Sequence, residues 1–209
     1  MFSGFVHLHT HSSYSPMWGV PTLEALCQAA RAQGHDRLAL TDTNGLYGAI
    51  RFLDVAKHLG LKPILGAELI KGQHRAVLLA KNPEGYANLC RLLSARHEQE
   101  PFEFIETVQR YRAGLVIISD DVVALTAWQA QVGEDLYVEL TPGAELQEAV
   151  TFSRQSRIPP VATTRAAMLR PTDFEAHRLL RAIAENTTLS RLRPERCCAS
   201  SHWLMPCSV

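Results

Sequence analysis

Short runs of β-branched and other apolar residues recur along the chain and alternate with segments of helical period. Such alternation is typical of α/β proteins whose strands are mostly parallel. The predicted strands are Phe5 to His9, Arg37 to Thr41, Pro63 to Leu69, Arg75 to Ala80, Leu115 to Ser119, Leu136 to Leu140 and Pro160 to Thr163. Seven strands separated by helices favour a closed or nearly closed barrel. An open sheet is the alternative, because periodicity does not decide closure.

Apolar residues spaced three and four apart predict helices between these strands. The first such stripe is Leu23, Leu26, Cys27 and Ala30, with Thr22 before it as a candidate N-cap. Further helices are predicted from Leu46 to Gly60, after Asn82-Pro83, and over Phe102 to Arg112, Asp121 to Gln131, Ala144 to Arg157 and Thr172 to Glu185. The periodic apolar face is lost from Thr187 onward. We therefore predict one domain over residues 1–189 and a tail, or the start of a following segment, over residues 190–209.

Composition narrows the class of protein. The chain has 209 residues, 46% of them hydrophobic, which is enough for one sizeable core. Lysine plus arginine and aspartate plus glutamate number 21 each, so any contact with nucleic acid has to come from a local patch. The sequence has no leader pattern and no apolar run of membrane length, and its five cysteines form no C-x-x-C pair. These features predict a cytoplasmic protein with reduced thiols and no membrane association.

The stretch His7-Leu8-His9-Thr10-His11 is the main chemical signal in the sequence. In a strand, alternation places His7 and His9 on the same side, and two imidazoles at the carboxyl end of a strand can hold a metal ion. The alternative is a polar strand end with solvated histidines, since two ligands alone do not make a site.

Several carboxylates and one further histidine could complete a metal site. Together with the histidine pair they would suit zinc or manganese bound for phosphoester hydrolysis. Structural roles are the alternatives, such as a turn cap at Asp42 or a salt bridge at Glu139. The group at Cys197, Cys198, His202 and Cys207 matches no standard structural-zinc spacing. The candidate additional ligands are Asp42, Glu68, His74, Asp120, Asp121 and Glu139.

Five sequence blocks resemble the PHP (polymerase and histidinol phosphatase) domain that opens bacterial DNA polymerase III alpha subunits. The resemblance runs from His7 to about Leu189 and implies an α/β fold, a distorted seven-stranded (β/α) barrel. Residues 180–189 are similar to the error-prone, accessory branch of these polymerases. The blocks are His7 to Ser15, Ala39 to Ala49, Leu65 to Glu68, Leu79 to Leu89, and Val161 to Thr164 leading to His177.

The resemblance also implies a metal site that is only partly present. His7, His9 and Glu68 match family ligands, Asp121 falls near a further ligand position, and His74 and Asp42 are weaker candidates. At the remaining ligand positions the family's aspartates and histidines are replaced. The replacing residues are Trp18, Thr43, Arg75, Arg165 and Ala167. Loss of these donors predicts either no metal or a weakly bound zinc or manganese ion.

The predicted function is therefore that of a structural or interaction module without catalysis of its own, within a polymerase for DNA replication or error-prone repair. By resemblance, its partners are the rest of the polymerase chain, a proofreading exonuclease subunit and DNA, and the polymerase reaction itself would use magnesium. The alternative is a metal-dependent phosphoesterase or 3'-5' exonuclease with a reduced metal site.

Overall fold

The computed structural model describes residues 4–130, 134–143 and 145–207. The chain divides into two compact units. Unit 1 comprises Met1–Asp42, Tyr47–Ile64 and Thr164–Val209, and unit 2 comprises Thr43–Leu46 and Leu65–Thr163. Both units are assembled from segments that are distant in the sequence.

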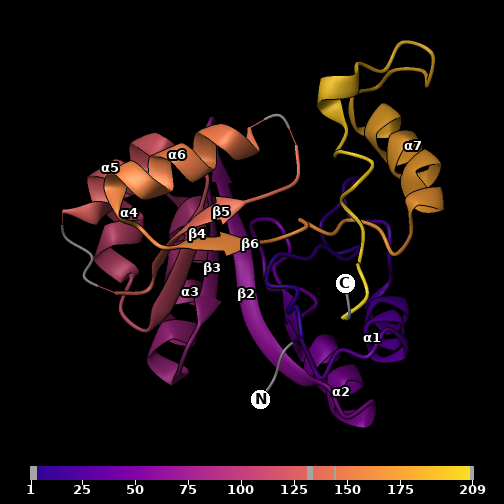
Figure 1. Ribbon diagram of the computed structural model, residues 1–209, viewed down its shortest axis with the longest axis horizontal. Helices are drawn as coiled ribbons and strands as arrows, with labels where there is room; N and C mark the ends of the chain where they lie inside the picture. The colour runs from indigo at the N-terminus through magenta and orange to yellow at the C-terminus, as the bar shows by residue number, and fades with distance from the viewer. Residues whose placement is uncertain (1–3, 131–133, 144, 208–209) are drawn as a thin grey trace. The chain divides into compact units, whose positions relative to one another are not determined.

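The strands form a six-stranded sheet in the order of the sequence (Figure 1). Six of the seven predicted strands are confirmed, but the expectation of mostly parallel strands is wrong in part. The β2–β3 and β3–β4 pairs are antiparallel, whereas the β4–β5 and β5–β6 pairs are parallel. A two-residue turn at Gly72 and Gln73 joins β2 to β3, and its glycine has a φ of 60°, as tight hairpins require. The strands are β1 (Arg37–Leu40), β2 (Lys62–Lys71), β3 (His74–Ala80), β4 (Leu115–Ser119), β5 (Leu136–Leu140) and β6 (Pro160–Ala162).

The predicted first strand, Phe5 to His9, is extended chain and not a regular strand. The backbone carbonyl of His7 accepts a hydrogen bond from Ala39, and that of His9 accepts one from Ala166, each at 3.0 Å. An isolated parallel bridge joins Thr10 to Ala166. Because neither neighbour continues as a ladder along this segment, a complete seven-stranded barrel is not confirmed.

The predicted helices are confirmed with small shifts at their ends, and their caps follow the sequence. The side chain of Thr22 accepts from the backbone of Ala25, and that of Asn82 from Gly85. Gln131 and Ala144, where two helices were predicted to end and begin, lie outside the described residues. No described helix is long and apolar enough to cross a membrane. The helices are α1 (Leu23–Ala32), α2 (Ala49–His58), α3 (Pro83–Glu98), α4 (Phe104–Tyr111), α5 (Val122–Gln129), α6 (Leu146–Ser156) and α7 (Phe174–Ala184), the last preceded by a short 3₁₀ turn (Pro171–Asp173).

Unit 2 has one apolar core, between one face of its strands and the helices α3 to α6 (Figure 1). Alternate residues of each strand enter it, such as Leu69 of β2 and Leu78 of β3, where they pack with Trp128 of α5. We call this the helix-covered face. The residues between them, among them Glu68, Arg75 and the apolar Val77, point to the opposite face, which we call the polar face after its charged side chains.

Unit 1 packs α1 against α2 and also contains the last described residues. Leu204 is fully buried, and its backbone N–H donates to the carbonyl of Met168. A parallel bridge joins Met168 to Trp203. The segment after Leu189 is thus fixed to unit 1 by its end, while the domain boundary expected there stays a prediction.

Gly85 provides a test of the packing in unit 2. A Cβ atom at this position would lie 1.9 Å from the carbonyl oxygen of Gly114, too close for any side chain. Gly85→Ala should therefore lower the free energy of unfolding by about 1–3 kcal/mol, as overpacking does. Urea denaturation measures the change, with Ser94→Ala on the exposed side of α3 as the control. Equal stability of the two variants would show that this close approach is wrong.

Candidate metal centre

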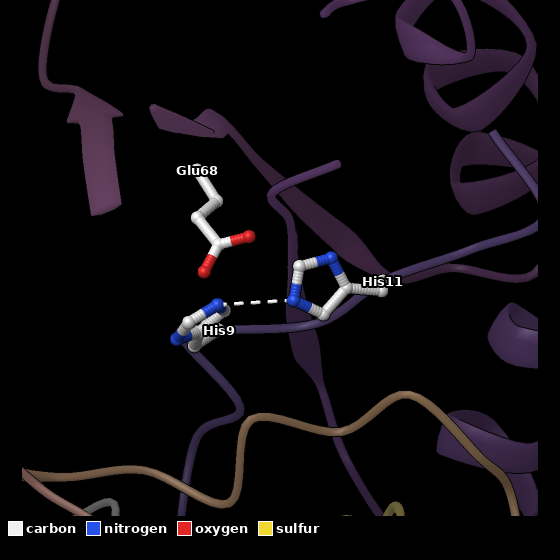
Figure 2. Close-up of side chains that lie close together, drawn as sticks. All are labelled: His9, His11 and Glu68. Atoms are coloured by element: carbon white, nitrogen blue, oxygen red, sulfur yellow. Dashed lines mark hydrogen bonds between the residues drawn. The ribbon is translucent and has the colours of Figure 1, made fainter. Parts of the chain in front are cut away.

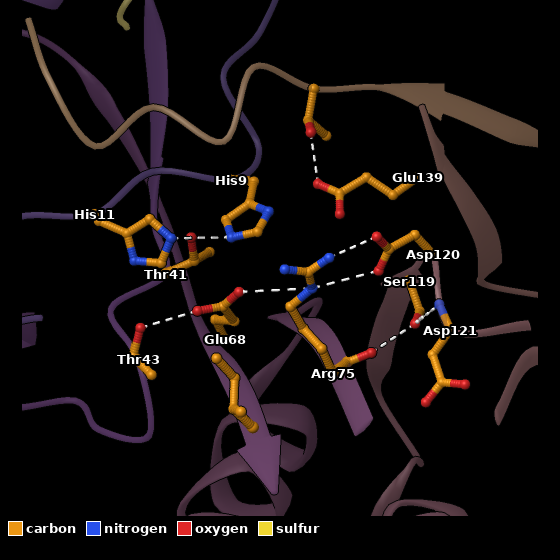
Figure 3. Close-up of polar contacts among 12 residues, drawn as sticks. His9, His11, Thr41, Thr43, Glu68, Arg75, Ser119, Asp120, Asp121 and Glu139 are labelled. Carbon is orange, nitrogen blue, oxygen red and sulfur yellow. Dashed lines mark hydrogen bonds and ion pairs between the residues drawn. The ribbon is translucent and has the colours of Figure 1, made fainter. Parts of the chain in front are cut away.

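Arg75 lies between Glu68 and Asp120 on the polar face of unit 2 (Figure 3). Its guanidinium donates to both carboxylate oxygens of Asp120, at 2.5 and 3.3 Å, and its Nε lies 4.0 Å from Oε1 of Glu68. The Glu68 side chain is only 6% exposed and that of Asp120 19%. One cation thus serves two largely buried carboxylates.

Glu68 is held at its other oxygen by Thr43. The Thr43 hydroxyl donates to Oε2 of Glu68 at 2.9 Å, and the backbone N–H of Asn44 donates to the Glu68 carbonyl at 2.7 Å. Thr43 stands where the family resemblance assigns a histidine. The hydroxyl at this position orients the Glu68 carboxylate by a hydrogen bond. It does not supply the imidazole nitrogen that could bind a metal ion.

His74 and Asp121 form a separate pair. By strand alternation His74 points to the helix-covered face, away from Glu68 and Arg75, and its ring stacks on Phe104 at 5.4 Å. Its Nδ1 donates to Asp121 at 2.6 Å. The other Asp121 oxygen caps α5 by accepting from Val123 and Ala124. His74 thus contacts Asp121, which caps α5, and does not take over the position of Arg75.

In unit 1, a hydrogen bond of 3.1 Å joins Nε2 of His9 to Nε2 of His11, so a metal ion bound by both atoms would displace the shared proton (Figure 2). Both rings are buried. Two nitrogens at this separation, each about 2.1 Å from a zinc ion, would subtend about 95° at the metal, within the range of metal coordination. The pair therefore fits a divalent ion.

A hydrogen-bond chain fixes the ring state of His11. Ser15 donates its hydroxyl proton to Asp42 at 2.7 Å, so its oxygen accepts from Nδ1 of His11 at 3.1 Å. Nε2 of His11 then carries the lone pair that a metal would need. Asp42 also accepts from the backbone and hydroxyl of Ser12. Burial raises the pKa of Asp42, and these hydrogen bonds oppose that shift.

The predicted ligands do not include His11, although it belongs to the histidine stretch. His7, which was predicted as a ligand, has both ring nitrogens engaged within unit 1. Its Nε2 donates to the carbonyl of Met205 at 2.9 Å, and the hydroxyl of Thr164 lies 3.0 Å from its Nδ1. Coordination by His7 would require one of these contacts to break.

The other positions that the resemblance gives to metal in unit 1 hold packing residues. Trp18 meets the His177 ring edge-on at 5.1 Å and lies under the guanidinium of Arg181 at 5.2 Å. Ala167 is fully buried. Arg165 has a φ of 46°, in the left-handed region.

The likeness to solved structures shows the fold class, an α/β protein of PHP type. One neighbour is a two-domain protein from Bacteroides vulgatus containing a predicted PHP-like metal-dependent phosphoesterase, with a TM-score of 0.54 and 13% identity over 77% of this chain and 51% of that one. Another is an amidohydrolase from Chromobacterium violaceum, with a TM-score of 0.52 and 16% identity over 76% of this chain and 86% of that one.

The PHP domain family matches residues 7–154, and the chain belongs to this family. It is 32% identical to a DNA polymerase III subunit alpha from Buchnera aphidicola, over 88% of this chain and 19% of that protein. It is 48% identical to an error-prone DNA polymerase from Symbiobacterium thermophilum, over 46% of this chain and 9% of that protein. The chain thus spans a fifth or less of the length of these relatives.

His7 of unit 1 predicts how the free energy of unfolding depends on pH. Burial, opposed by the Met205 hydrogen bond, lowers the pKa of His7 to about 4 from an ordinary 6.5. The folded state thus favours neutral His7, and this contribution is complete above pH 6.5 and is lost as pH falls toward 4. It amounts to about 3 kcal/mol. His7→Gln should therefore be less stable than the wild type at pH 7.5, with a gap that narrows by pH 4.

Urea denaturation across this pH range measures that gap. His58→Gln is the control, because the His58 side chain is 74% exposed. A gap for His7→Gln that stays constant with pH would contradict the assignment of a neutral, buried His7.

Proposed function

We propose that this chain is a structural PHP module of a DNA polymerase III alpha-type protein, in which Arg75 supplies the positive charge that the family obtains from metal. The observation that carries the proposal is the contact of one guanidinium with Asp120 and Glu68. An arginine stays protonated at every physiological pH, so its charge is permanent. It offers hydrogen-bond donors and no lone pair, so it neutralises the carboxylates without activating water.

Membership of the relatives in the polymerase alpha class supports the wider part of the proposal. The partners would be the remaining polymerase chain, a proofreading exonuclease subunit and, through the polymerase, DNA. Magnesium would serve the polymerase reaction and would bind outside the residues described above. The module's contribution would be to fold and to present surfaces.

A second function is favoured by one observation, the converging Nε2 atoms of His9 and His11. We infer a reduced site for one divalent ion, zinc or manganese, with this pair as ligands. Such an ion would supply Lewis acidity and a bound hydroxide for phosphoester or 3'-5' exonuclease hydrolysis. The protein's own residues would orient the ligands through the chain from Asp42 to Ser15 to His11.

The exchange of metal for arginine can be tested with Arg75→Met, which keeps the side-chain bulk and removes the charge. Asp120 and Glu68 would then lack their shared cation, and the free energy of unfolding should fall by roughly 1–3 kcal/mol, less than for a fully buried pair because Arg75 is 32% exposed. Manganese or zinc should then raise the melting temperature of Arg75→Met more than that of the wild type.

Arg91→Met is the matched control, because Arg91 is exposed and, among the described residues, its side chain bonds only to its helix neighbour Asn88. If Arg75→Met is as stable as this control and gains no more from metal than the wild type, the guanidinium does not stand in for an ion.

Metal content separates the two functions. The full chain, loaded with zinc or manganese and desalted, should retain less than about one equivalent, because the recognisable ligands are too few for a closed site. His9→Ala should remove what is retained, whereas His58→Ala should not. One or more tightly held ions per chain by elemental analysis, with phosphodiesterase activity lost in His9→Ala, would establish the enzyme and overturn the structural module.

A further inference from the structure

One exposed surface of unit 1 is rich in arginine. It consists of α7 and the segment that follows it to residue 200, and we call it the arginine face. Between residues 175 and 196 the sequence has five arginines and three glutamates, an excess of two positive charges in a chain whose net charge is zero. The backbone folds this segment back on α7, since Arg181 donates to the carbonyl of Arg196 at 2.7 Å.

The arginines of this face differ in their partners. On α7, Arg178 pairs with Glu175 at 3.0 Å and Arg181 with Glu185 at 2.9 Å. Arg191 and Arg193 are exposed and form no ion pair with any described residue. Glu175 is 71% exposed, so its pair with Arg178 contributes little stability and can exchange for another anion.

Hydroxyl groups and a pocket complete the surface. Thr188 and Ser190 are exposed, with their hydroxyl oxygens 3.1 Å apart, and such hydroxyls commonly donate to phosphates beside arginine. A pocket of about 520 Å³ opens between α7 and the segment that follows it. It is lined by Phe174, Arg178, Leu192, Pro194, Cys197 and Ala199, among others. Apolar walls with one guanidinium suit a flat base more than a charged group.

We propose that the arginine face binds single-stranded DNA, with Arg191 and Arg193 on phosphates and an unpaired base in the pocket beside Arg178. The choice of DNA rests on the proposed function as part of a polymerase. The Buchnera relative's match leaves out only about 25 residues, so it reaches α7, whereas the PHP family match ends at residue 154. The arginine face therefore begins at α7, which lies after the end of the PHP family match but within the match to the polymerase subunit. Base stacking, which a duplex does not offer, favours a single strand.

The test is fluorescence anisotropy of a fluorescein-labelled oligo-dT of about 20 nucleotides, titrated with the full chain at several salt concentrations. The Arg191→Ser, Arg193→Ser double variant should bind about tenfold more weakly at low salt. Its plot of log affinity against log salt should lose about 1.4 of its slope, the value for two phosphate contacts on a single strand. The control, Arg31→Ser with Arg154→Ser, makes the same charge change at exposed helix ends and should bind like the wild type.

A second variant tests the pocket. Ala199→Trp, at an exposed position of the pocket wall, should weaken binding of oligo-dT and leave the weaker binding of a duplex of equal length unchanged. Thermal melting would verify that all variants fold. The proposal is overturned if the wild type does not bind, if the control loses as much affinity as the double variant, or if duplex binds better and Ala199→Trp has no effect. Metal content and the Arg75→Met result do not depend on this face, so each proposal can fail alone.

Discussion

A carboxylate buried on the polar face of unit 2 needs a positive partner, and this need organises the surrounding residues. The pairing of β2 with β3 places the positive partner, Arg75, beside Glu68. The Gly72-Gln73 turn fixes the β2–β3 register, which sets Glu68 opposite Val77 and Ile70 opposite Arg75. Glu68 and Arg75 are therefore diagonal neighbours on one face. A register shift of one residue would move Arg75 to the helix-covered face and leave the Glu68 carboxylate without this cation.

The two units differ in the groups that they carry at the positions where the family resemblance places metal ligands. In unit 2 the carboxylates remain but are neutralised by a cation that belongs to the chain. In unit 1, hydrogen bonds run from His11 through Ser15 to Asp42. These hydrogen bonds set the tautomer of His11, as binding of a metal ion would require. They also satisfy buried polar groups when no metal is bound. The same contacts are thus compatible with both proposed functions, which differ in the metal affinity that they require.

The sequence predicted local features well because local rules decide them. The caps at Thr22 and Asn82 and the alternation of β2 to β5 follow from neighbouring residues. Because His74 and Arg75 are consecutive residues of a predicted strand, alternation also predicts that their side chains point to opposite faces of the sheet. The pattern of residues 5–9 is that of a strand, but the segment makes only single hydrogen bonds to Ala39 of β1 and to Ala166 and forms no continuous ladder. The function of His11 depends on Asp42, 31 residues away in sequence, and no spacing rule reveals it.

Trp18 links the altered metal positions to the remainder of unit 1. Its ring lies under Arg181, and Arg181 also donates to the carbonyls of Met17 and Arg196. His177, which contacts the same ring, donates to the Trp18 carbonyl and accepts from Cys198. A residue at a family ligand position has thus become part of the packing that holds α7 and the following segment. An aspartate at position 18 would add a carboxylate but remove the ring that lies under Arg181, so this one substitution would change the packing of unit 1 as well as its set of donors.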